Sequence, residues 1–329
     1  MESAKISVVM CTYNGEKFVS EQIDSILAQT FPPLEIIIQD DNSTDQTWNI
    51  LTEYAQKHPS VRIFRNENGK GVNANFYSAM QRATGDYIAI SDQDDRWEAD
   101  KHEKQIQRIG DNALCGGFSR PFSTEGLPLH FESRLPNFEL LRLLYINPVS
   151  GHTQMFRREL IDKIPYDSLY LELRYYDAIL MLLAQAEGGV TFVEDVLVNH
   201  RRHGSSMTYT KPKDNKLTLN NIFRNVHRTW KLYQELKPEM KRRLNEARLF
   251  LESTGIRNEA VENAKKLCRL QQDTSLFGVM RMSLFCAKHK TELFYTREDK
   301  GIVTLLRALY FPVSSSEYFG YLSKDFKRF

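Results

Sequence analysis

Two hydrophobic patterns alternate along the first hundred residues. Runs of β-branched and other apolar residues, typical of buried strands, each end in polar positions. The segments between these runs place apolar residues at helical spacing, as at Phe18, Ile23 and Ile26. The pattern predicts strands within residues 5–14, 32–41, 60–66 and 86–91, and helices within residues 16–30, 43–58 and 73–84.

This alternation, with short connecting loops, predicts an α/β fold with a doubly wound, mainly parallel sheet and right-handed crossovers. Ser43 or Thr44 is a favourable N-cap for the second helix, and Gly85 is expected to stop the third. Beyond residue 110 the pattern is looser. We expect a strand within residues 153–160, a helix within 176–188 and a late strand from residue 190.

The chain changes character near residue 211. Four segments between residues 220 and 289 have helical periodicity, and a polar stretch with Pro212 precedes them. We therefore predict an α/β domain at residues 1–210 and an α-helical C-terminal domain at residues 211–329.

Composition excludes several classes of protein. Hydrophobic residues make up 41% and charged residues 26%, which is typical of a globular chain. The net charge of +2 gives no indication of a nucleic-acid partner. The N-terminus lacks the pattern of a secretory leader, and no apolar run reaches the roughly 18 residues of a membrane span. The four cysteines are scattered, which favours reduced thiols in a cytoplasmic protein over a disulfide framework or a zinc site.

Polar side chains follow three of the predicted strands. Thr12, Tyr13 and Asn14 end the first strand, and Asp40 and Asp41 end the second. The fourth strand ends in the acidic cluster Asp92, Asp94 and Asp95. In an open parallel sheet, ligands bind beyond the carboxyl ends of the strands, so these groups should meet at one edge.

A divalent cation would neutralise the acidic cluster. Mg²⁺ and Mn²⁺ prefer carboxylate oxygens and are often shared with substrate phosphates. The sequence has neither the GxxxxGK[ST] phosphate loop nor a GxGxxG motif after the first strand. These features predict a metal-dependent protein that binds a nucleotide diphosphate conjugate.

An ordered series of motifs resembles the family 2 glycosyltransferases. The series comprises "VVMCTYNGEKFVSEQIDSILAQT", "EIIIQDDNSTDQT", "GKGVNANFYSAMQRATGDYIAISDQDD" and "NHRRHGSS", and covers residues 5–207. It looks most like the rhamnosyltransferase-like and galactosyltransferase-like branch, in which "SDQDD" before a tryptophan is typical. The resemblance implies a GT-A catalytic domain, an inverting mechanism and a nucleotide-sugar donor.

The resemblance also implies roles for residues that match the family's motifs. Thr12, Tyr13 and Asn14 match the segment that faces the nucleotide, and Asp40 and Asp41 match the acids beside the base and ribose. Asp92 and Asp94 match the DxD motif, whose first acid usually meets the ribose and whose second usually binds the metal.

Further matches complete the predicted site. Asp177 matches the acid that serves as catalytic base, and His203 matches a late histidine of the metal or diphosphate site. Asn75 and Gln93 are predicted to contact the nucleotide sugar. The sequence departs from many relatives around Asp177, where Tyr176 and Ala178 replace a second acid or a His-Asp pair and following aromatics.

Together these features predict an inverting hexosyl- or deoxyhexosyltransferase of surface-polysaccharide (O-antigen or capsule) synthesis. The donor is expected to be a UDP- or dTDP-sugar, the acceptor a glycan that is lipid-linked, and the cofactor Mn²⁺ or Mg²⁺. Two alternatives stay open. One is a nucleotidyltransferase on a related sheet, although residues 10–20 lack the glycine- and basic-rich loop that a triphosphate needs. The other is a non-catalytic protein that binds carbohydrate or nucleotide.

The C-terminal region is basic and amphipathic. Residues 211–250 hold 11 Lys and Arg against 4 Asp and Glu, with Phe223, Trp230 and Tyr233 among them. Such a stretch can lie peripherally on the inner face of an anionic membrane. An ordinary helical packing domain or a contact in a homo-oligomer accounts for it equally well.

Overall fold

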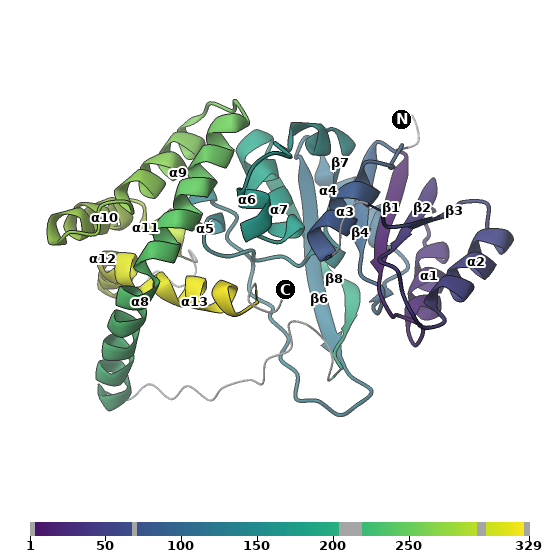
Figure 1. Ribbon diagram of the computed structural model, residues 1–329, viewed down its shortest axis with the longest axis horizontal. Coiled ribbons are helices and arrows are strands. Elements are labelled where there is room, and N and C mark those ends of the chain that lie inside the picture. The colour runs from purple at the N-terminus through teal and green to yellow at the C-terminus, as the bar shows by residue number, and fades with distance from the viewer. Residues whose placement is uncertain (1–3, 68–70, 204–218, 295–300, 326–329) are drawn as a thin grey trace. The chain divides into compact units, whose positions relative to one another are not determined.

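The computed structural model describes residues 4–67, 71–203, 219–294 and 301–325. The chain forms two compact units, drawn in Figure 1. The first comprises residues 1–135, 149–164 and 175–212, and the second comprises residues 136–148, 165–174 and 213–329. Two short segments from the middle of the chain thus belong to the helical unit. The segment near residue 210, where the sequence predicts a domain boundary, lies mostly outside the described residues.

The first unit is built on a sheet of eight strands in the order β3-β2-β1-β4-β7-β6-β8-β5. Strands β1 to β4 pair in parallel, as predicted, and β6 pairs in parallel with β8. Strand β7 runs antiparallel to β4 and β6, and β5 runs antiparallel to β8, so the sheet is mixed. The strand bounds are Ile6–Thr12, Glu35–Asp40, Val61–Arg65, Tyr87–Ser91, Arg96–Trp97, Leu114–Phe122, Met155–Arg157 and Val190–Arg201 for β1 to β8.

The helices of this unit have the bounds Val19–Leu27 (α1), Thr47–Lys57 (α2), Val72–Met80 (α3), Lys101–Ile109 (α4) and Tyr176–Glu187 (α7), with short 3₁₀ turns at Gly151–Thr153 (η1) and Arg158–Lys163 (η2). Helices α1, α2, α3 and α7 lie in the segments that the hydrophobic pattern predicts, whereas α4 lies in a segment for which no helix is predicted.

Two predicted helix boundaries are wrong. Helix α2 begins at Thr47 rather than after Ser43 or Thr44, because the Asp45 carboxylate accepts hydrogen bonds from the Thr47 amide and hydroxyl. Helix α3 ends at Met80, well before Gly85. Gly85 serves packing instead, since a Cβ there would lie 2.7 Å from the Lys5 carbonyl oxygen.

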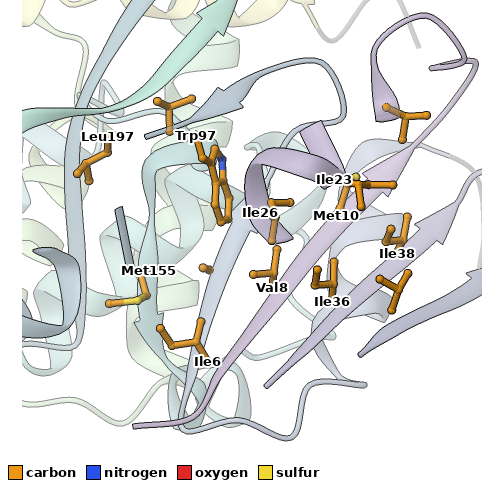
Figure 2. Packing of buried hydrophobic residues seen from close by; sticks show 14 of the residues in the cluster. Ile6, Val8, Met10, Ile23, Ile26, Ile36, Ile38, Trp97, Met155 and Leu197 are labelled. Atoms are coloured by element: carbon orange, nitrogen blue, oxygen red, sulfur yellow. The ribbon is translucent and has the colours of Figure 1, made fainter. Parts of the chain in front are cut away.

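The core of the first unit forms where α1 packs on the parallel strands. Ile6, Val8 and Met10 alternate along β1, as the two-residue period of a strand requires. Figure 2 shows Val8 and Met10 beside Ile26 and Ile23 of α1 and next to the isoleucines of β2, with Ile6 farther along β1 toward Met155. Every residue of β2 is buried, so both faces of the sheet are covered, which is the pattern of a parallel strand inside an α/β fold.

The second unit is helical. Helix α8 (Leu219–Ser253) continues through Pro238 as one helix of 35 residues, where the sequence suggested two segments. The other helices are α5 (Leu140–Leu143), α6 (Tyr170–Leu173), α9 (Glu259–Leu270), α10 (Leu276–Lys288), α11 (Lys290–Leu293), α12 (Ile302–Ser314) and α13 (Ser316–Asp325). Among the described residues, we found no helix with both the length and the apolar character that a membrane crossing requires.

Buried arginines tie the inserted segments into this unit. Arg142 of α5 donates a 2.6 Å hydrogen bond to the carbonyl oxygen of Leu293, and Arg243 of α8 donates one of the same length to that of Leu173. Residues 136–148 and 165–174 are therefore held by the C-terminal helices.

Candidate functional site

The carboxyl ends of β1, β2 and β4 lie at one edge of the sheet. Thr12 is in register with Asp40, and Met10 with Ser91. The Gln93 side chain joins the loops that follow β1 and β4. Its Oε1 accepts a hydrogen bond from the Tyr13 amide at 2.9 Å, and its Nε2 donates one to the Tyr13 carbonyl oxygen at 3.1 Å. The Tyr13 ring is 57% exposed beside this clamp. Gln93 therefore positions the tyrosine.

Asp40 is fully buried, and both of its carboxylate oxygens accept hydrogen bonds from neighbouring residues. Its Oδ1 accepts from the Thr12 hydroxyl at 2.9 Å and from the Ser43 hydroxyl at 2.5 Å. Its Oδ2 accepts from the Ser43 amide and forms a 2.5 Å ion pair with Arg65. Asn14, which has a positive φ of 47°, accepts a hydrogen bond from the Thr44 amide in the same loop. Asp40 thus has a structural role in joining the ends of the first three strands.

Asp41 is partly exposed and orients the loop after β3. It accepts hydrogen bonds from the Asn66 side chain at 2.7 Å and from the Gly71 amide at 3.1 Å. Asn75 is buried and pairs with Gln39, donating to its carbonyl oxygen and accepting from its side chain. Of the acids that end β2, Asp41 is therefore the one that a ligand can reach.

A buried histidine holds the first acid of the cluster. The Nδ1 of His152 lies 3.1 Å from the Asp92 carboxylate, and its Nε2 lies 2.8 Å from the Ser119 hydroxyl. His152 has no appreciable exposure, whereas the Asp92 side chain is 39% exposed. Burial alone would lower the pKa of His152, but the nearby carboxylates of Asp95 and Asp92 raise it above its ordinary value.

Asp94 pairs with His203, the other residue predicted to bind the metal. The His203 Nε2 lies 2.9 Å from Asp94 Oδ2, and the imidazole packs on the Phe18 ring with centroids 5.3 Å apart. Burial raises the pKa of Asp94 and the neighbouring Asp92 charge raises it further, while His203 acts in the opposite direction.

Asp95 is the most deeply buried acid of the cluster, and its carboxylate lacks part of its hydrogen bonding. One oxygen accepts from the Arg201 amide at 2.9 Å, and the other accepts no hydrogen bond from the described residues. Burial raises its pKa to about 7, although His152 opposes the shift. Ligand atoms of Asp95, His152 and His200 all lie within 4.8 Å of one another.

Asp177 lies next to this network. It occupies the first turn of α7, where its carboxylate accepts from the Gly151 amide at 3.2 Å and from the Ala178 amide at 2.8 Å. Gly151 directly precedes His152, and a Cβ on it would lie 2.6 Å from the Tyr176 hydroxyl. Both Asp92 and Asp177 raise the pKa of Tyr176, in addition to burial. The predicted base and the predicted nucleotide-binding acid are thus close in space.

Sequence reasoning missed two histidines, His152, which is buried, and His200, which is partly buried. His152 lies in the polar stretch Gly151–Gln154 before β7, and that stretch was the only available signal. His200, whose ring meets that of His152 edge-on with centroids 4.4 Å apart, lies in the basic segment that ends β8, where nothing in the sequence sets it apart.

These groups fit a divalent cation. The carboxylate of Asp95 converges with the imidazole nitrogens of His152 and His200, and one buried Asp95 oxygen lacks a hydrogen-bond donor among the described residues. Both nitrogens of His152 have protein partners, and Asp94 with His203 forms a second carboxylate–imidazole pair, with 2.9 Å between oxygen and nitrogen. Mn²⁺ accepts such a mixed oxygen and nitrogen set.

Comparison with solved structures shows the fold. The chain matches a crystal structure of residues 1–349 of Staphylococcus aureus TarS in complex with UDP-GlcNAc, with a TM-score of 0.55 and 16% identity. The match covers 98% of this chain and 92% of that chain. The chain therefore shares the GT-A fold of that structure.

Curated relatives match over shorter stretches. The uncharacterised protein Rv1520 of Mycobacterium tuberculosis is 27% identical over 64% of this chain, and the match spans only 62% of its own length. The putative teichuronic acid biosynthesis glycosyltransferase TuaG of Bacillus subtilis is 28% identical over 73% of this chain and 97% of its own. An Escherichia coli protein, UDP-Glc:alpha-D-GlcNAc-diphosphoundecaprenol beta-1,3-glucosyltransferase WfgD, is 34% identical over 35% of this chain and 44% of its own.

The family match covers the strands and loops that carry the acids. Residues 7–165 match glycosyl transferase family 2 and include β1 to β7, Asp92, Asp94 and His152. The rhamnosyltransferase-like and galactosyltransferase-like branch is not distinguished by these matches. Residues 7–165 of this chain, just under half of it, are thus similar to glycosyl transferase family 2.

Proposed function

We propose that this chain transfers a sugar, with inversion, from a nucleotide-sugar donor to a hydroxyl group of a glycan in surface-polysaccharide synthesis. One observation carries the proposal. The Asp177 carboxylate is held by the amide of Gly151, and the next residue, His152, holds Asp92. An acid suited to acceptor activation and an acid suited to donor binding are thereby fixed to one short turn.

The donor nucleotide is assigned to the edge formed by β1, β2 and β4. The exposed Tyr13 ring offers a stacking surface for a base, and Asp41 and Asp92 offer carboxylates to the base and ribose. A UDP- or dTDP-sugar is the donor we favour. TarS was crystallised with UDP-GlcNAc, and the printed name of WfgD includes UDP-Glc.

Asp177 is the proposed general base. An acceptor hydroxyl is a weak nucleophile until a positioned carboxylate removes its proton. The hydroxyl oxygen then forms a bond to the anomeric carbon while the bond from that carbon to the diphosphate oxygen breaks, and the nucleoside diphosphate leaves with the electron pair. One displacement of this kind inverts the anomeric centre and needs no covalent nucleophile.

Asp94 and His203 are the residues that would hold Mn²⁺ or Mg²⁺. A bound divalent cation would supply positive charge to the diphosphate of the donor. His152 keeps Asp92 oriented beside this pair, so it acts as a positioning residue rather than as a ligand.

The acceptor is proposed to be a lipid-linked glycan. This assignment is supported by the printed name of WfgD, which includes a diphosphoundecaprenol, and by that of TuaG, which refers to teichuronic acid biosynthesis. The structure adds the basic, amphipathic character of the C-terminal helices.

The test compares Asp177→Asn with the wild type. We expect the variant to bind the donor nucleotide as the wild type does and to lose about 10²–10⁴-fold in the rate of sugar transfer. Donor binding is measured calorimetrically with UDP- and dTDP-sugars, and transfer by release of nucleoside diphosphate with an undecaprenyl-diphosphate-linked acceptor. Glu187→Gln, at the other end of α7, is the matched control. Donor binding without any transfer by the wild type would favour a non-catalytic binding protein instead.

A further inference from the structure

Helix α10 in the second unit presents apolar side chains to solvent. Leu276 is 87% exposed, and Phe277, Met280 and Leu284 are 51–61% exposed. These four positions follow helical spacing and lie on one face, while Met282, Phe285 and Cys286 on the other face are buried. A helix with both faces apolar is typical of an element that packs against something on each side.

Helix α12 continues the exposed apolar face. Ile302 and Leu306 are 72% and 60% exposed, and Val303, Leu305 and Leu309 are 36–48% exposed. The two helices pack against each other, and the Ser283 hydroxyl of α10 donates a 2.7 Å hydrogen bond to the Leu309 carbonyl of α12. Figure 1 shows them adjacent in the C-terminal region. We call these nine residues of α10 and α12 the α10–α12 face.

The start of α8 extends this face with an interfacial aromatic residue. Trp230 and Val226 are each 45% exposed, and the Tyr310 hydroxyl of α12 lies within hydrogen-bond distance of the Val226 carbonyl. Tryptophan with an exposed ring is enriched where one end of a side chain is apolar and the other is wet, as at a membrane surface.

The charged residues of helices α10 and α12 are all positive. Helices α10 and α12 contain Arg281, Lys288 and Arg307 and no Asp or Glu. Nearby described acids pair with cations or imidazoles, as Asp273 does with Arg281 and Glu317 with Arg228. A wide apolar surface whose helices contribute basic but no acidic side chains is complementary to anionic lipid headgroups, with Lys288 and Arg307 beyond the Arg281–Asp273 pair.

From these observations we infer that the α10–α12 face docks on the surface of an anionic lipid bilayer. Each helix has 13 residues, against the roughly 20 that a span needs, so the helices would lie in the plane of the headgroups. The apolar side chains enter the acyl boundary and the basic groups meet lipid phosphates. The inference rests on this surface alone and does not depend on the proposed reaction.

The test is flotation of the full chain with vesicles of phosphatidylglycerol and phosphatidylcholine, or of phosphatidylcholine alone. We expect binding to the anionic vesicles, and Leu306→Glu or Phe277→Glu should weaken it at least about tenfold. Arg307→Gln should weaken it about fivefold. Leu34→Glu is the matched control, since Leu34 is 46% exposed in the first unit. Leu306→Gln repeats the test without a new charge.

Light scattering on the same variants measures self-association, and together with flotation it can overturn the proposal. If the chain self-associates, ignores the vesicles and becomes monomeric in Leu306→Glu, the α10–α12 face is an interface between copies of this chain. If the wild type floats with neither type of vesicle, or floats equally well with all the variants, bilayer docking through this face is excluded.

Discussion

Strands β2 and β4 flank β1, and both end in acids at the same edge of the sheet, but the acids of the two strands have different hydrogen-bonding partners. At the end of β2, Asp40 has no exposure, accepts four hydrogen bonds and includes Arg65 among its partners. At the end of β4, the hydrogen bonds to the carboxylates of Asp92 and Asp94 come from His152 and His203.

The difference separates a structural acid from acids prepared for a ligand. A buried carboxylate is costly unless charged and hydrogen-bonding partners compensate it. Asp40 has such compensation within the chain. Asp94 and Asp95 have raised pKa values because burial and mutual repulsion dominate, and one Asp95 oxygen has no donor among the described residues. The β4 end therefore has a deficit of positive charge that a cation with a nucleotide diphosphate would remove.

The largest expected effect is that of Asp94→Asn. We expect the transfer rate to fall by about 10³-fold, because the cation loses its principal carboxylate. The free energy of unfolding without metal should be unchanged or higher, since a buried carboxylate with a raised pKa is removed. Steady-state kinetics and urea denaturation measure the two quantities. A fall in stability comparable to that of an Asp40 variant would contradict the distinction between the two strand ends.

Asp40→Asn should have the opposite profile. The substitution leaves the partly exposed Arg65 and two hydroxyl donors without their carboxylate, so the free energy of unfolding should fall by about 2 kcal/mol. Urea denaturation monitored by circular dichroism measures this loss. Asp41→Asn is the control and should cost less, because Asp41 is partly exposed. Unaltered stability in Asp40→Asn would show that the ion pair is dispensable.

His152 variants should have a smaller effect, on cation binding and turnover. His152→Ala is expected to lower Mn²⁺ affinity and kcat/KM by about 10–100-fold, as the loss of an orienting partner commonly does. In His152→Asn, the side-chain amide places a donor near the position of the imidazole Nδ1, which faces Asp92. In His152→Gln, the longer side chain places its donor near the position of Nε2, which faces Ser119. His152→Asn should therefore recover more activity than His152→Gln. Equal activity in both would indicate a packing role alone.

The stability of the metal-free protein should depend on pH. Burial raises the folded pKa of Asp95 to about 7, so the folded state keeps a proton that the unfolded state loses near pH 4. The free energy of unfolding of the metal-free protein should then fall as pH rises from about 4 to about 7, by at most about 1.4 kcal/mol per pH unit for this proton. The raised pKa of His152 acts in the same direction at higher pH. Asp95→Asn should flatten the profile measured in urea with EDTA.

The parallel half of the fold could be predicted because its signals are local. β-Branched runs and helical spacing give β1 to β4 and the helices between them, and the strand-end rule brings Tyr13, Asp41 and Asp92 to one edge. The pairing of Asp94 with His203 came from the family resemblance, since these residues are 109 positions apart and no spacing rule connects them.

The remaining features depend on contacts that single segments do not encode. His152 lies in a turn whose path is set by the tight packing of Gly151 against Tyr176. Asp40 and Asp92 look alike in sequence, and only the hydroxyl and guanidinium groups around Asp40 show that it is structural. The continuation of α8 through Pro238 reflects packing that overrides the local preference for a break.

The most direct test of the account is the thermal stability of the wild type, Asp94→Asn and Asp41→Asn with UDP or dTDP, with and without Mn²⁺. A ligand that binds only the folded state raises the melting temperature by mass action. We predict that the nucleotide stabilises the wild type strongly only when Mn²⁺ is present, that Asp94→Asn removes the effect of Mn²⁺, and that Asp41→Asn weakens stabilisation by the nucleotide while leaving its dependence on Mn²⁺ intact. Equal stabilisation of the wild type and Asp94→Asn by nucleotide and Mn²⁺ would contradict the claim that the β4 end is completed by a cation and a nucleotide.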